Sequence, residues 1–481
     1  MDKYEAIIGL EIHAELMTKS KMFTGAPVVD SVAAEPNTAV SPLCLGMPGT
    51  LPVINKKAVE YALRVALALN CTINQDNIFA RKNYFYPDLP KGYQISQYEE
   101  PLGVNGWLDV TLNGKMRRIR IRRVHMEEDT GKLTHMDDGT SLVDYNRAGV
   151  PLLEIVTEPD IHSGEEARAY AMKIRQILRY LGVNSGDMEK GVLRVEPNIS
   201  IRPSGSDEFG TRTELKNLNS FRVLADGTAY EIERQAKVLD AGGQVVQETR
   251  GWNEAKKRTF SQRVKEEAED YRYFPEPDLP PLYISEEWIV AARAALPELP
   301  DAKATRYVNE LGLSAYEAQV LAEERAVGEW FDTAVTAGGA PKSIAKWMIN
   351  ELFRLMNEHR QTIDQIQVTP PALVELIALV DKGTINNNTA KDVLAEMFTT
   401  GQSPQEIVTA KGLAQISDED ALTTAVAQIL DDNPEMVARY LAGEDKLRGW
   451  FVGQVMKATR GKANPGLVNQ LLSQQLAERE Q

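Results

Sequence analysis

The chain is poor in cysteine and contains no long apolar run. Cys44 and Cys71 are its only cysteines in 481 residues, which excludes a disulfide scaffold and a four-thiolate zinc site. No segment approaches the ~20 consecutive apolar residues that a membrane-spanning helix needs. The N-terminus has neither an apolar signal region nor a transit-peptide composition. We therefore expect a cytoplasmic protein that is not inserted in a membrane.

Several common catalytic motifs are also missing. The sequence has no phosphate-binding loop of the Gly-x-x-x-x-Gly-Lys-Ser/Thr type, no dinucleotide-binding glycine fingerprint after a strand and no Gly-x-Ser-x-Gly elbow. Neither cysteine lies in a motif typical of a catalytic nucleophile. If this chain uses amide nitrogen, another protein must release it.

Net charge limits the interaction with nucleic acid to local sites. The formal charge of −15 opposes a protein that coats nucleic acid along its whole surface. One stretch near the C-terminus nevertheless contains five cations and no acid, namely Lys446, Arg448, Lys457, Arg460 and Lys462. Such a stretch predicts a local, salt-sensitive RNA contact.

Strand-like segments are concentrated in roughly the first 285 residues. Alternating or apolar segments at 7–12, 107–112, 117–124, 149–156 and 198–201 predict strands, and helical spacing predicts helices at 58–69 and 163–181. Ser163 and Glu166 have the spacing of a capping box, and Gly182 lies where a helix commonly ends. Because strands and helices do not alternate regularly, we predict an α+β fold with an antiparallel sheet.

Helical patterns replace the strands after the proline-rich segment 274–281. Helices are predicted at 286–296, 302–311, 314–323, 343–359, 371–382, 388–399, 418–431, 434–442, 448–459 and 465–478, with a break at 401–411. The chain length favours two to four domains. We therefore predict a domain at 1–285 and two all-helical domains at 286–405 and 406–481.

The segment Arg117–Lys132 places arginines directly before a histidine and three acids. Ile119, Ile121 and Val124 alternate with basic residues, which predicts a half-buried strand with a cationic face. Cations for phosphate beside carboxylates for a divalent metal are the combination that phosphoryl transfer uses. The alternative is a salt-bridged edge strand followed by a solvated acidic turn.

Acids on other predicted strands supply partners for this segment. Glu11 and His13 are two residues apart, so in a strand their side chains share one face. Glu196, Glu214 and Lys216 fall at similar alternating positions. Acids spread over several strands suit magnesium, and the histidine leaves manganese or zinc open. The alternative is that Glu11 and His13 are ordinary surface residues.

Cations are interleaved with aromatic residues at 79–93 and again at 271–274. This composition is typical of loops that stack on bases and contact phosphate. An aromatic minicore beneath a proline-rich loop explains it equally well.

Long motifs along the whole chain resemble the B subunit of the bacterial glutamyl/aspartyl-tRNA amidotransferases. The motifs are Gly9–His13, Glu35–Thr38, Leu45–Gly49, Arg81–Gln94, His125–Asp129, Asp144–Leu152, Lys216–Ser220, Asp270–Leu279, Gly453–Lys457 and Gly461–Pro465. The resemblance implies a cradle domain built on an antiparallel sheet, an all-α helical domain and an all-α YqeY-like tail that binds tRNA.

The same resemblance implies a three-subunit carbon–nitrogen ligase that uses ATP, Mg²⁺ and glutamine. The A subunit, which is an amidase, would release ammonia from glutamine, and the small C subunit would complete the heterotrimer. The present chain would phosphorylate the side-chain carboxylate of Glu-tRNA(Gln) or Asp-tRNA(Asn), and ammonia would displace the phosphate. The sequence leaves open which of the two aminoacyl-tRNAs is used.

Carried over by motif, the resemblance also implies the site residues. The metal ligands would be Glu11, His13, Glu128, Glu196 and Glu214, with Lys91 as a further catalytic residue. The choice between Glu127 and Glu128 stays open. Ser41 stands where many relatives have a zinc-binding cysteine, which argues against a structural zinc, and Glu196 stands where aspartate is common. Two other functions are weighed against this one: a non-catalytic tRNA scaffold and a ligase acting on a free amino acid.

Overall fold

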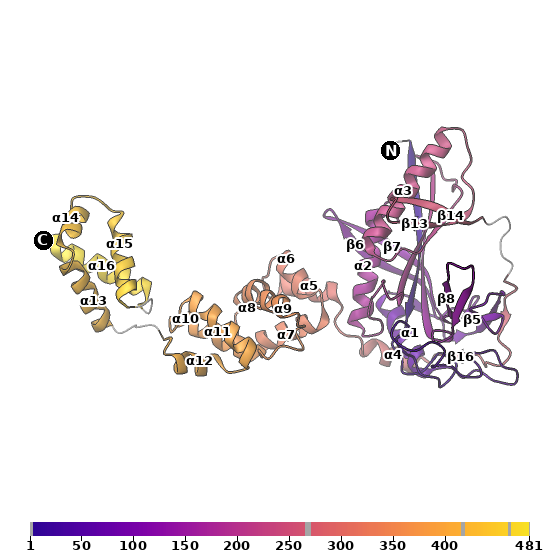
Figure 1. Ribbon diagram of the computed structural model, residues 1–481, viewed down its shortest axis with the longest axis horizontal. Coiled ribbons are helices and arrows are strands. Elements are labelled where there is room, and N and C mark those ends of the chain that lie inside the picture. Colours follow the sequence, from indigo (N-terminus) through magenta and orange to yellow (C-terminus); the bar gives the residue numbers. More distant parts are fainter. Residues whose placement is uncertain (1–2, 265–270, 415–418, 460–462, 481) are drawn as a thin grey trace. The chain divides into compact units, whose positions relative to one another are not determined.

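The computed structural model describes residues 3–264, 271–414, 419–459 and 463–480. Two compact units divide the chain, Met1–Leu299 and Pro300–Gln481, and their elements are labelled in Figure 1. Within the described residues, no helix is both long and apolar enough to cross a bilayer.

The first unit is organised around a large twisted sheet. Among the residues described, its strands follow the order β14 (Arg258–Val264), β13 (Glu248–Asn253), β12 (Thr213–Lys216), β11 (Leu193–Pro203), β1 (Tyr4–Glu15), β10 (Pro151–Thr157), β7 (Lys115–Glu128), β6 (Gly103–Leu112) and β2 (Thr72–Ile73). Neighbouring strands run antiparallel except β12 and β13, which are parallel. The predicted α+β class with an antiparallel sheet is confirmed.

One face of this sheet is apolar and carries the core of the first unit. In β1 the side chains of Ile8, Leu10 and Ile12 are fully or almost fully buried, whereas Glu11 and His13 alternate with them. The apolar face packs against α1 (Lys56–Ala68), α2 (Gly164–Tyr180) and α3 (Phe221–Asp240), and Figure 1 shows α2 and α3 lying along the sheet. Burying one face of each strand leaves the other face available for polar side chains.

Helix α2 begins at the predicted cap. The Ser163 hydroxyl accepts a hydrogen bond from the Glu166 N–H at 3.2 Å, while the Glu166 carboxylate accepts one from the His162 N–H at 2.8 Å. Gly182 follows the helix with φ +66°, the left-handed conformation that favours glycine. The Ser163 cap and the glycine after the helix are confirmed, but the Glu166 carboxylate accepts from the His162 N–H in place of the Ser163 N–H that a capping box uses.

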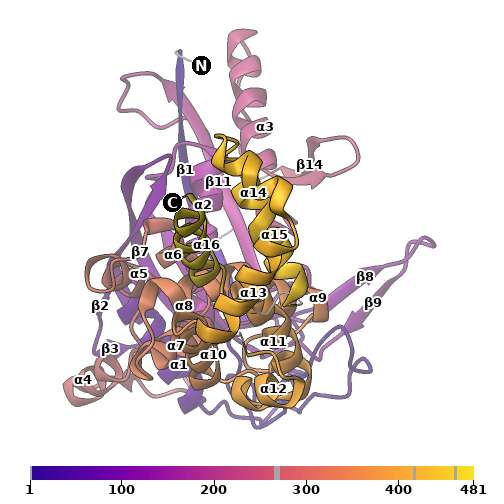
Figure 2. The ribbon, with the colours of Figure 1, turned by 90° about the vertical axis from the view of Figure 1, so that its left-hand side faces the viewer.

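Short strands surround the large sheet. β15 (Phe274–Pro275), β4 (Phe79–Asn83) and β5 (Tyr93–Gln97) form one small sheet, β16 (Leu282–Tyr283) pairs with β3 (Asp76–Asn77), and β8 (Lys132–His135) pairs with β9 (Ser141–Asp144). Figure 2 shows the β8–β9 hairpin projecting from its unit.

The second unit is helical throughout its described residues. Its helices are α5 (Pro300–Asn309), α6 (Ala315–Leu321), α7 (Arg325–Thr336), α8 (Pro341–Trp347), η1 (Met348–Leu352), α9 (Phe353–His359), α10 (Pro370–Asp381), α11 (Asn387–Thr400), α12 (Pro404–Lys411), α13 (Glu419–Asp431), α14 (Pro434–Leu441), α15 (Leu447–Ala458) and α16 (Pro465–Glu480). One hydrophobic core draws its residues from Tyr307 to Val408, and another from Leu422 to Leu476.

Three details differ from the sequence-based expectation. The break expected at 401–411 is wrong, because helix α12 occupies it and buries Ile407 and Val408 in the same core as Tyr307. Helix α4 (Glu286–Ala294) follows the expected boundary after residue 285, yet its Ile289 belongs to the core of the first unit. The helix expected at 343–359 contains a π-helical turn, η1. The exact limits of the three domains stay a prediction.

We predict that the buried stripe of α2 stabilises the first unit. Leu178 is fully buried, whereas Met172 on the same helix is 42% exposed. Leu178→Ala should lower the free energy of unfolding of this unit by about 2–5 kcal/mol, because it removes buried methyl groups and leaves a cavity. Peptide-resolved hydrogen exchange of β1 and β11 in increasing urea would measure the loss, with Met172→Ala as the matched control. Equal effects of the two substitutions would contradict the prediction.

Candidate active site

Acids and histidines converge on the polar face of the large sheet. The pairing register places His13 opposite Glu154 and Arg194, and Glu11 opposite Glu196. Glu154 in turn lies opposite His125 on β7. Because side chains alternate between the two faces of a strand, directly paired residues share a face. Five adjacent strands, β7, β10, β1, β11 and β12, therefore contribute to one polar surface.

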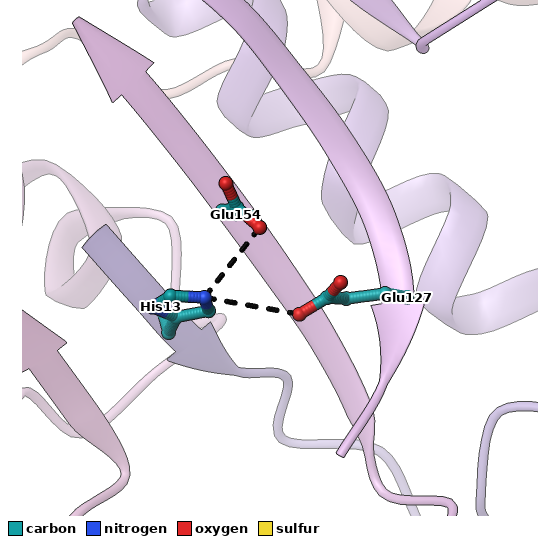
Figure 3. Close-up of side chains that lie close together, drawn as sticks. All are labelled: His13, Glu127 and Glu154. Atoms are coloured by element: carbon teal, nitrogen blue, oxygen red, sulfur yellow. Dashed lines mark ion pairs between the residues drawn. The ribbon is translucent and has the colours of Figure 1, made fainter. Parts of the chain in front are cut away.

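The first cluster on this surface consists of His13, Glu127 and Glu154. His13 Nε2 lies 3.5 Å from Glu154 Oε2 and 3.9 Å from Glu127 Oε1 (Figure 3). His125 adds a second imidazole, with Nε2 at 3.3 Å from Glu154 Oε2 and 3.7 Å from Glu127 Oε2. One ligand atom from each of His13, Glu127 and Glu154 lies within 4.8 Å of the others, so one small cation could contact all three.

In the first cluster the pKa of His13 is raised and the pKa of Glu154 is lowered. Burial lowers the pKa of His13, but the hydrogen bond to Glu154 and the charges of Glu154, Glu196 and Glu127 outweigh burial and raise this pKa to about 9. The pKa of Glu154 is held well below its usual value, because the two histidines outweigh the cost of its burial. Without a metal ion, a protonated His13 therefore balances the acids at neutral pH.

The second cluster consists of Glu11, Glu196 and Glu214. Their ligand oxygens also lie within 4.8 Å of one another. Lys216 Nζ lies 2.8 Å from Glu196 Oε2 and 3.2 Å from Glu214 Oε1. Asn198 Nδ2 donates to Glu11 Oε1 at 3.1 Å. Burial and the neighbouring charge of Glu154 raise the pKa of Glu11, which is the expected response of carboxylates held close together.

Both clusters fit a divalent cation. Carboxylate oxygens from three strands form the ligand type that Mg²⁺ prefers, and the imidazole of His13 also suits manganese. Nδ1 of His13 and Nδ1 of His125 are buried and have no hydrogen-bond partner among the described residues. The Nε2 atoms of both histidines are the ones that face Glu127 and Glu154, so the fit to a cation rests on the donor set and not on these Nδ1 atoms.

Glu128 and Lys91 lie outside both clusters. Adjacent residues of a strand point to opposite faces, so Glu127 faces His13 and Glu128 faces away. Glu128 Oε1 lies 2.5 Å from Lys91 Nζ and accepts a hydrogen bond from the Ile95 N–H at 3.0 Å. The structure thus gathers Glu11, Glu196 and Glu214 as predicted, but it groups His13 with Glu127 rather than Glu128. Catalytic roles for Glu128 and Lys91 stay predictions.

Glu154 and His125 were missed from the sequence. Glu154 interrupts an otherwise buried apolar strand, β10, and an acid at such a position is a usable signal. His125 follows the arginines of β7, and its position in the sequence alone indicates no role. Their meeting with His13 depends on the pairing of strands that are more than 100 residues apart, which periodicity does not reveal.

The arginines of β7 form ion pairs along the sheet surface. Arg118 binds Asp109 with two hydrogen bonds of 2.8 and 2.9 Å, and Arg120 binds Asp160 with two of 2.8 and 2.6 Å. Arg122 binds Glu158 in the same manner, at 3.0 and 2.9 Å. For these arginines the structure supports the salt-bridged alternative.

The predicted RNA-binding cations are distributed along the C-terminal helices. Lys446 and Lys457 are exposed, whereas Arg448 donates to the Ser473 hydroxyl at 2.7 Å and to the Asn469 carbonyl at 3.3 Å. Arg448 therefore also connects two helices. Arg460 and Lys462 lie outside the described residues.

Two buried clusters of carboxylates and imidazole on a sheet define a candidate divalent-cation centre of the kind that assists phosphoryl or acyl transfer. Comparison with known proteins shows the family of the chain. A family model described as the GatB/GatE catalytic domain matches residues 6–290, and one described as the GatB domain matches residues 329–476.

Relatives match along the whole chain. It is 55% identical to the B subunit of the aspartyl/glutamyl-tRNA(Asn/Gln) amidotransferase of Thermodesulfovibrio yellowstonii, over 99% of this chain and 100% of the relative. Proteins of the same name from Brevibacillus brevis and Persephonella marina are each 54% identical, over 99% and 98% of this chain and 99% and 100% of the relatives. The chain belongs to this family, and it is a subunit of a tRNA-dependent amidotransferase.

We predict that the two clusters bind divalent cations. Glu214→Gln and Glu154→Gln should each weaken Mn²⁺ binding at least tenfold, because each removes a charged ligand from one cluster. Isothermal titration calorimetry of the full chain measures this affinity. Glu158→Gln removes an acid that binds Arg122 at the surface and serves as the matched control. Equal affinities for Glu158→Gln, Glu214→Gln and Glu154→Gln would contradict the assignment.

Proposed function

We propose that this chain uses ATP to phosphorylate the side-chain carboxylate of Glu-tRNA(Gln) or Asp-tRNA(Asn), and that ammonia then displaces the phosphate to give Gln-tRNA(Gln) or Asn-tRNA(Asn). One observation carries the proposal: two residue clusters with the ligand atoms that a cation could contact share a polar sheet face in a member of this family. The names of the relatives specify aspartyl and glutamyl tRNA as their substrates.

The chemistry explains why acids and cations are both needed. A carboxylate is a poor acyl donor, and phosphorylation converts one of its oxygens into a good leaving group. The enzyme must hold two anions in line against their mutual repulsion. Mg²⁺, held by His13, Glu127 and Glu154 or by Glu11, Glu196 and Glu214, would neutralise charge that develops on the phosphoryl oxygens.

Side chains of the protein supply further positive charge around the clusters. Lys216 stays protonated, because Glu196 and Glu214 raise its pKa more than burial lowers it. Arg123 lies at the opposite side, with a terminal nitrogen 3.9 Å from Glu154 Oε1. In our proposal these cations orient the phosphate and stabilise the oxyanion that forms when ammonia attacks.

Ammonia has to come from a partner, since the cysteines of this chain are unsuited to glutamine hydrolysis. Cys44 and Cys71 are buried, and burial raises the pKa of Cys71 to about 12. We propose an amidase (the A subunit) and a small C subunit as partners, in the cytoplasm.

We propose no structural zinc beside Cys44. Lys21 Nζ lies 3.6 Å from Cys44 Sγ and donates to the Ala148 carbonyl at 2.7 Å. The ammonium group of Lys21 occupies the position beside the sulfur that a zinc ion would need. Ser41 supplies only a hydroxyl, 3.3 Å from the same sulfur.

We predict that amidation requires the first cluster. With both partner subunits, ATP, Mg²⁺ and mischarged tRNA, His13→Ala and Glu154→Gln should each lower the rate of product formation at least 100-fold, because charge on the transferred phosphoryl group would be left unbalanced. Acid-gel or chromatographic analysis of the aminoacyl-tRNA measures the product. Glu158→Gln is the control and should retain activity.

The alternatives predict different results in the same assay. A non-catalytic scaffold would keep full amidation in all three variants. A ligase for free amino acids would consume ATP with free glutamate or aspartate and would not need tRNA. Failure of the wild-type complex on both mischarged tRNAs, with each partner active, would overturn the proposal.

We predict that the basic C-terminal stretch binds tRNA through its phosphates. Combined Lys446→Ala and Lys457→Ala should weaken tRNA binding and reduce the slope of log affinity against log salt by about two, since each cation displaces about one counterion. Fluorescence anisotropy at several salt concentrations measures both quantities. Lys257→Ala, which removes an exposed cation in the first unit, should leave the slope unchanged.

A further inference from the structure

Two aromatic segments that are far apart in the sequence meet in the structure. Strand β15 pairs with β4, with Phe274 opposite Arg81, and the Asn83 N–H donates to the Tyr271 carbonyl at 2.9 Å. This pairing joins the two segments that the sequence marked as aromatic and basic, 79–93 and 271–274. Their tyrosines come together beside β5.

Three of these side chains and Tyr98, which directly follows β5, form a continuous aromatic group, which we call the tyrosine cluster: Tyr84, Tyr98, Tyr271 and Tyr273. Tyr98 and Tyr273 are stacked, with ring centroids 4.2 Å apart and planes inclined by 10°. Tyr271 contacts Tyr273 and Tyr84 edge to face, at 6.0 and 6.1 Å. Lys82 Nζ lies 4.9 Å from the centroid of the Tyr271 ring.

The tyrosine cluster adjoins the first acidic cluster. The Ser96 hydroxyl, on β5, donates to Glu127 Oε2 at 3.1 Å. Tyr98 follows Ser96 by two residues, which is ~7 Å along an extended chain. Burial and the charges of Glu127 and Glu154 raise the pKa of Tyr273. Tyr273 is therefore also close to the first acidic cluster, and its hydroxyl stays protonated at neutral pH.

Core packing alone does not explain this arrangement. Among the described residues, the hydrophobic core of the first unit includes none of the four tyrosines. Tyr98 remains 47% exposed although Tyr273 covers one face of its ring. Exposed aromatic surface beside an active site is typical of a binding site, and a nearby ammonium group suits a ligand that carries phosphate.

We propose that the tyrosine cluster stacks an adenine ring and so positions an adenosine beside the acids; this inference rests on the proposed function. Base–aromatic stacking is the common mode for holding an unpaired base. Two substrates of the proposed reaction contain an adenosine: ATP, and the tRNA, whose 3′-terminal adenosine carries the amino acid. Each has to place its reactive group next to the carboxylate clusters.

The test compares ring and non-ring side chains at Tyr98 in the full complex. Tyr98→Leu keeps apolar bulk and removes the stacking surface, whereas Tyr98→Phe keeps the ring. Tyr283→Leu makes the same change at a tyrosine that is 59% exposed elsewhere in the first unit and serves as the matched control. The measurements are the dissociation constant for ATP, by isothermal titration calorimetry, and the affinities for tRNA with and without its terminal adenosine.

We expect Tyr98→Leu to weaken one of the two adenosine interactions about 5- to 150-fold, with Tyr98→Phe within about twofold of wild type. A raised dissociation constant for ATP identifies ATP as the source of the ring. Loss of the preference for tRNA that carries its terminal adenosine identifies the tRNA.

The proposal is overturned if Tyr98→Leu behaves like Tyr283→Leu with both ligands. It is also overturned if Tyr98→Leu lowers the thermal midpoint and Tyr98→Phe fails to restore binding, because the stack then only holds β15 in place. These binding measurements do not depend on turnover. A wild-type complex that binds both ligands yet forms no amidated tRNA would therefore count against the proposed function and not against the stacking site.

Discussion

The crowding of acids on one buried face of the sheet is the constraint on which the rest of this structure depends. Glu11, Glu127, Glu154, Glu196 and Glu214 converge from five strands, and each is largely withdrawn from water. Buried carboxylates cost several kcal/mol unless they are paired. The opposite face, with its apolar core against three helices, holds the strands in register despite this repulsion. The apolar face thus stabilises the sheet, and the polar face carries the two acidic clusters.

Positively charged side chains offset the repulsion among the acids of this face. His13 takes up a proton, Lys216 bridges two glutamates, and Arg123 approaches Glu154. These compensating charges are local, so an incoming divalent cation would compete with a proton on His13 and with the Lys216 ammonium. Such competition would make metal binding depend on the protonation of His13. The arrangement suits a site that handles anionic phosphates.

Local patterns predicted the fold better than the site. Alternation identified β1, β7 and β11, and capping signals identified α2, because each depends on neighbouring residues. Helix α12 lies where a break was expected, although Ser403 and Glu406 form a capping box. Helices α3 and α7 were not predicted. The shared face of Glu11 and His13 follows from spacing of two, but the approach of Glu154 and His125 depends on long-range strand pairing.

A β-bulge in β7 explains how this strand places His125 and Glu127 on the polar face of the sheet, after a run of arginines on the same face. In β7, Ile119 and Ile121 point to the core, and strict alternation would next bury Arg123, His125 and Glu127. The register with β10 instead shifts between Val156 and Thr157, so that Arg122 is the extra residue. Val124 and Met126 are then buried, and His125 and Glu127 face His13. Bulges commonly redirect side chains beside active sites. The mark of this bulge in the sequence is the spacing of three between Ile121 and Val124, where Ile119 and Ile121 are spaced by two. Without the extra residue, His125 and Glu127 would point to the core and the first cluster could not form.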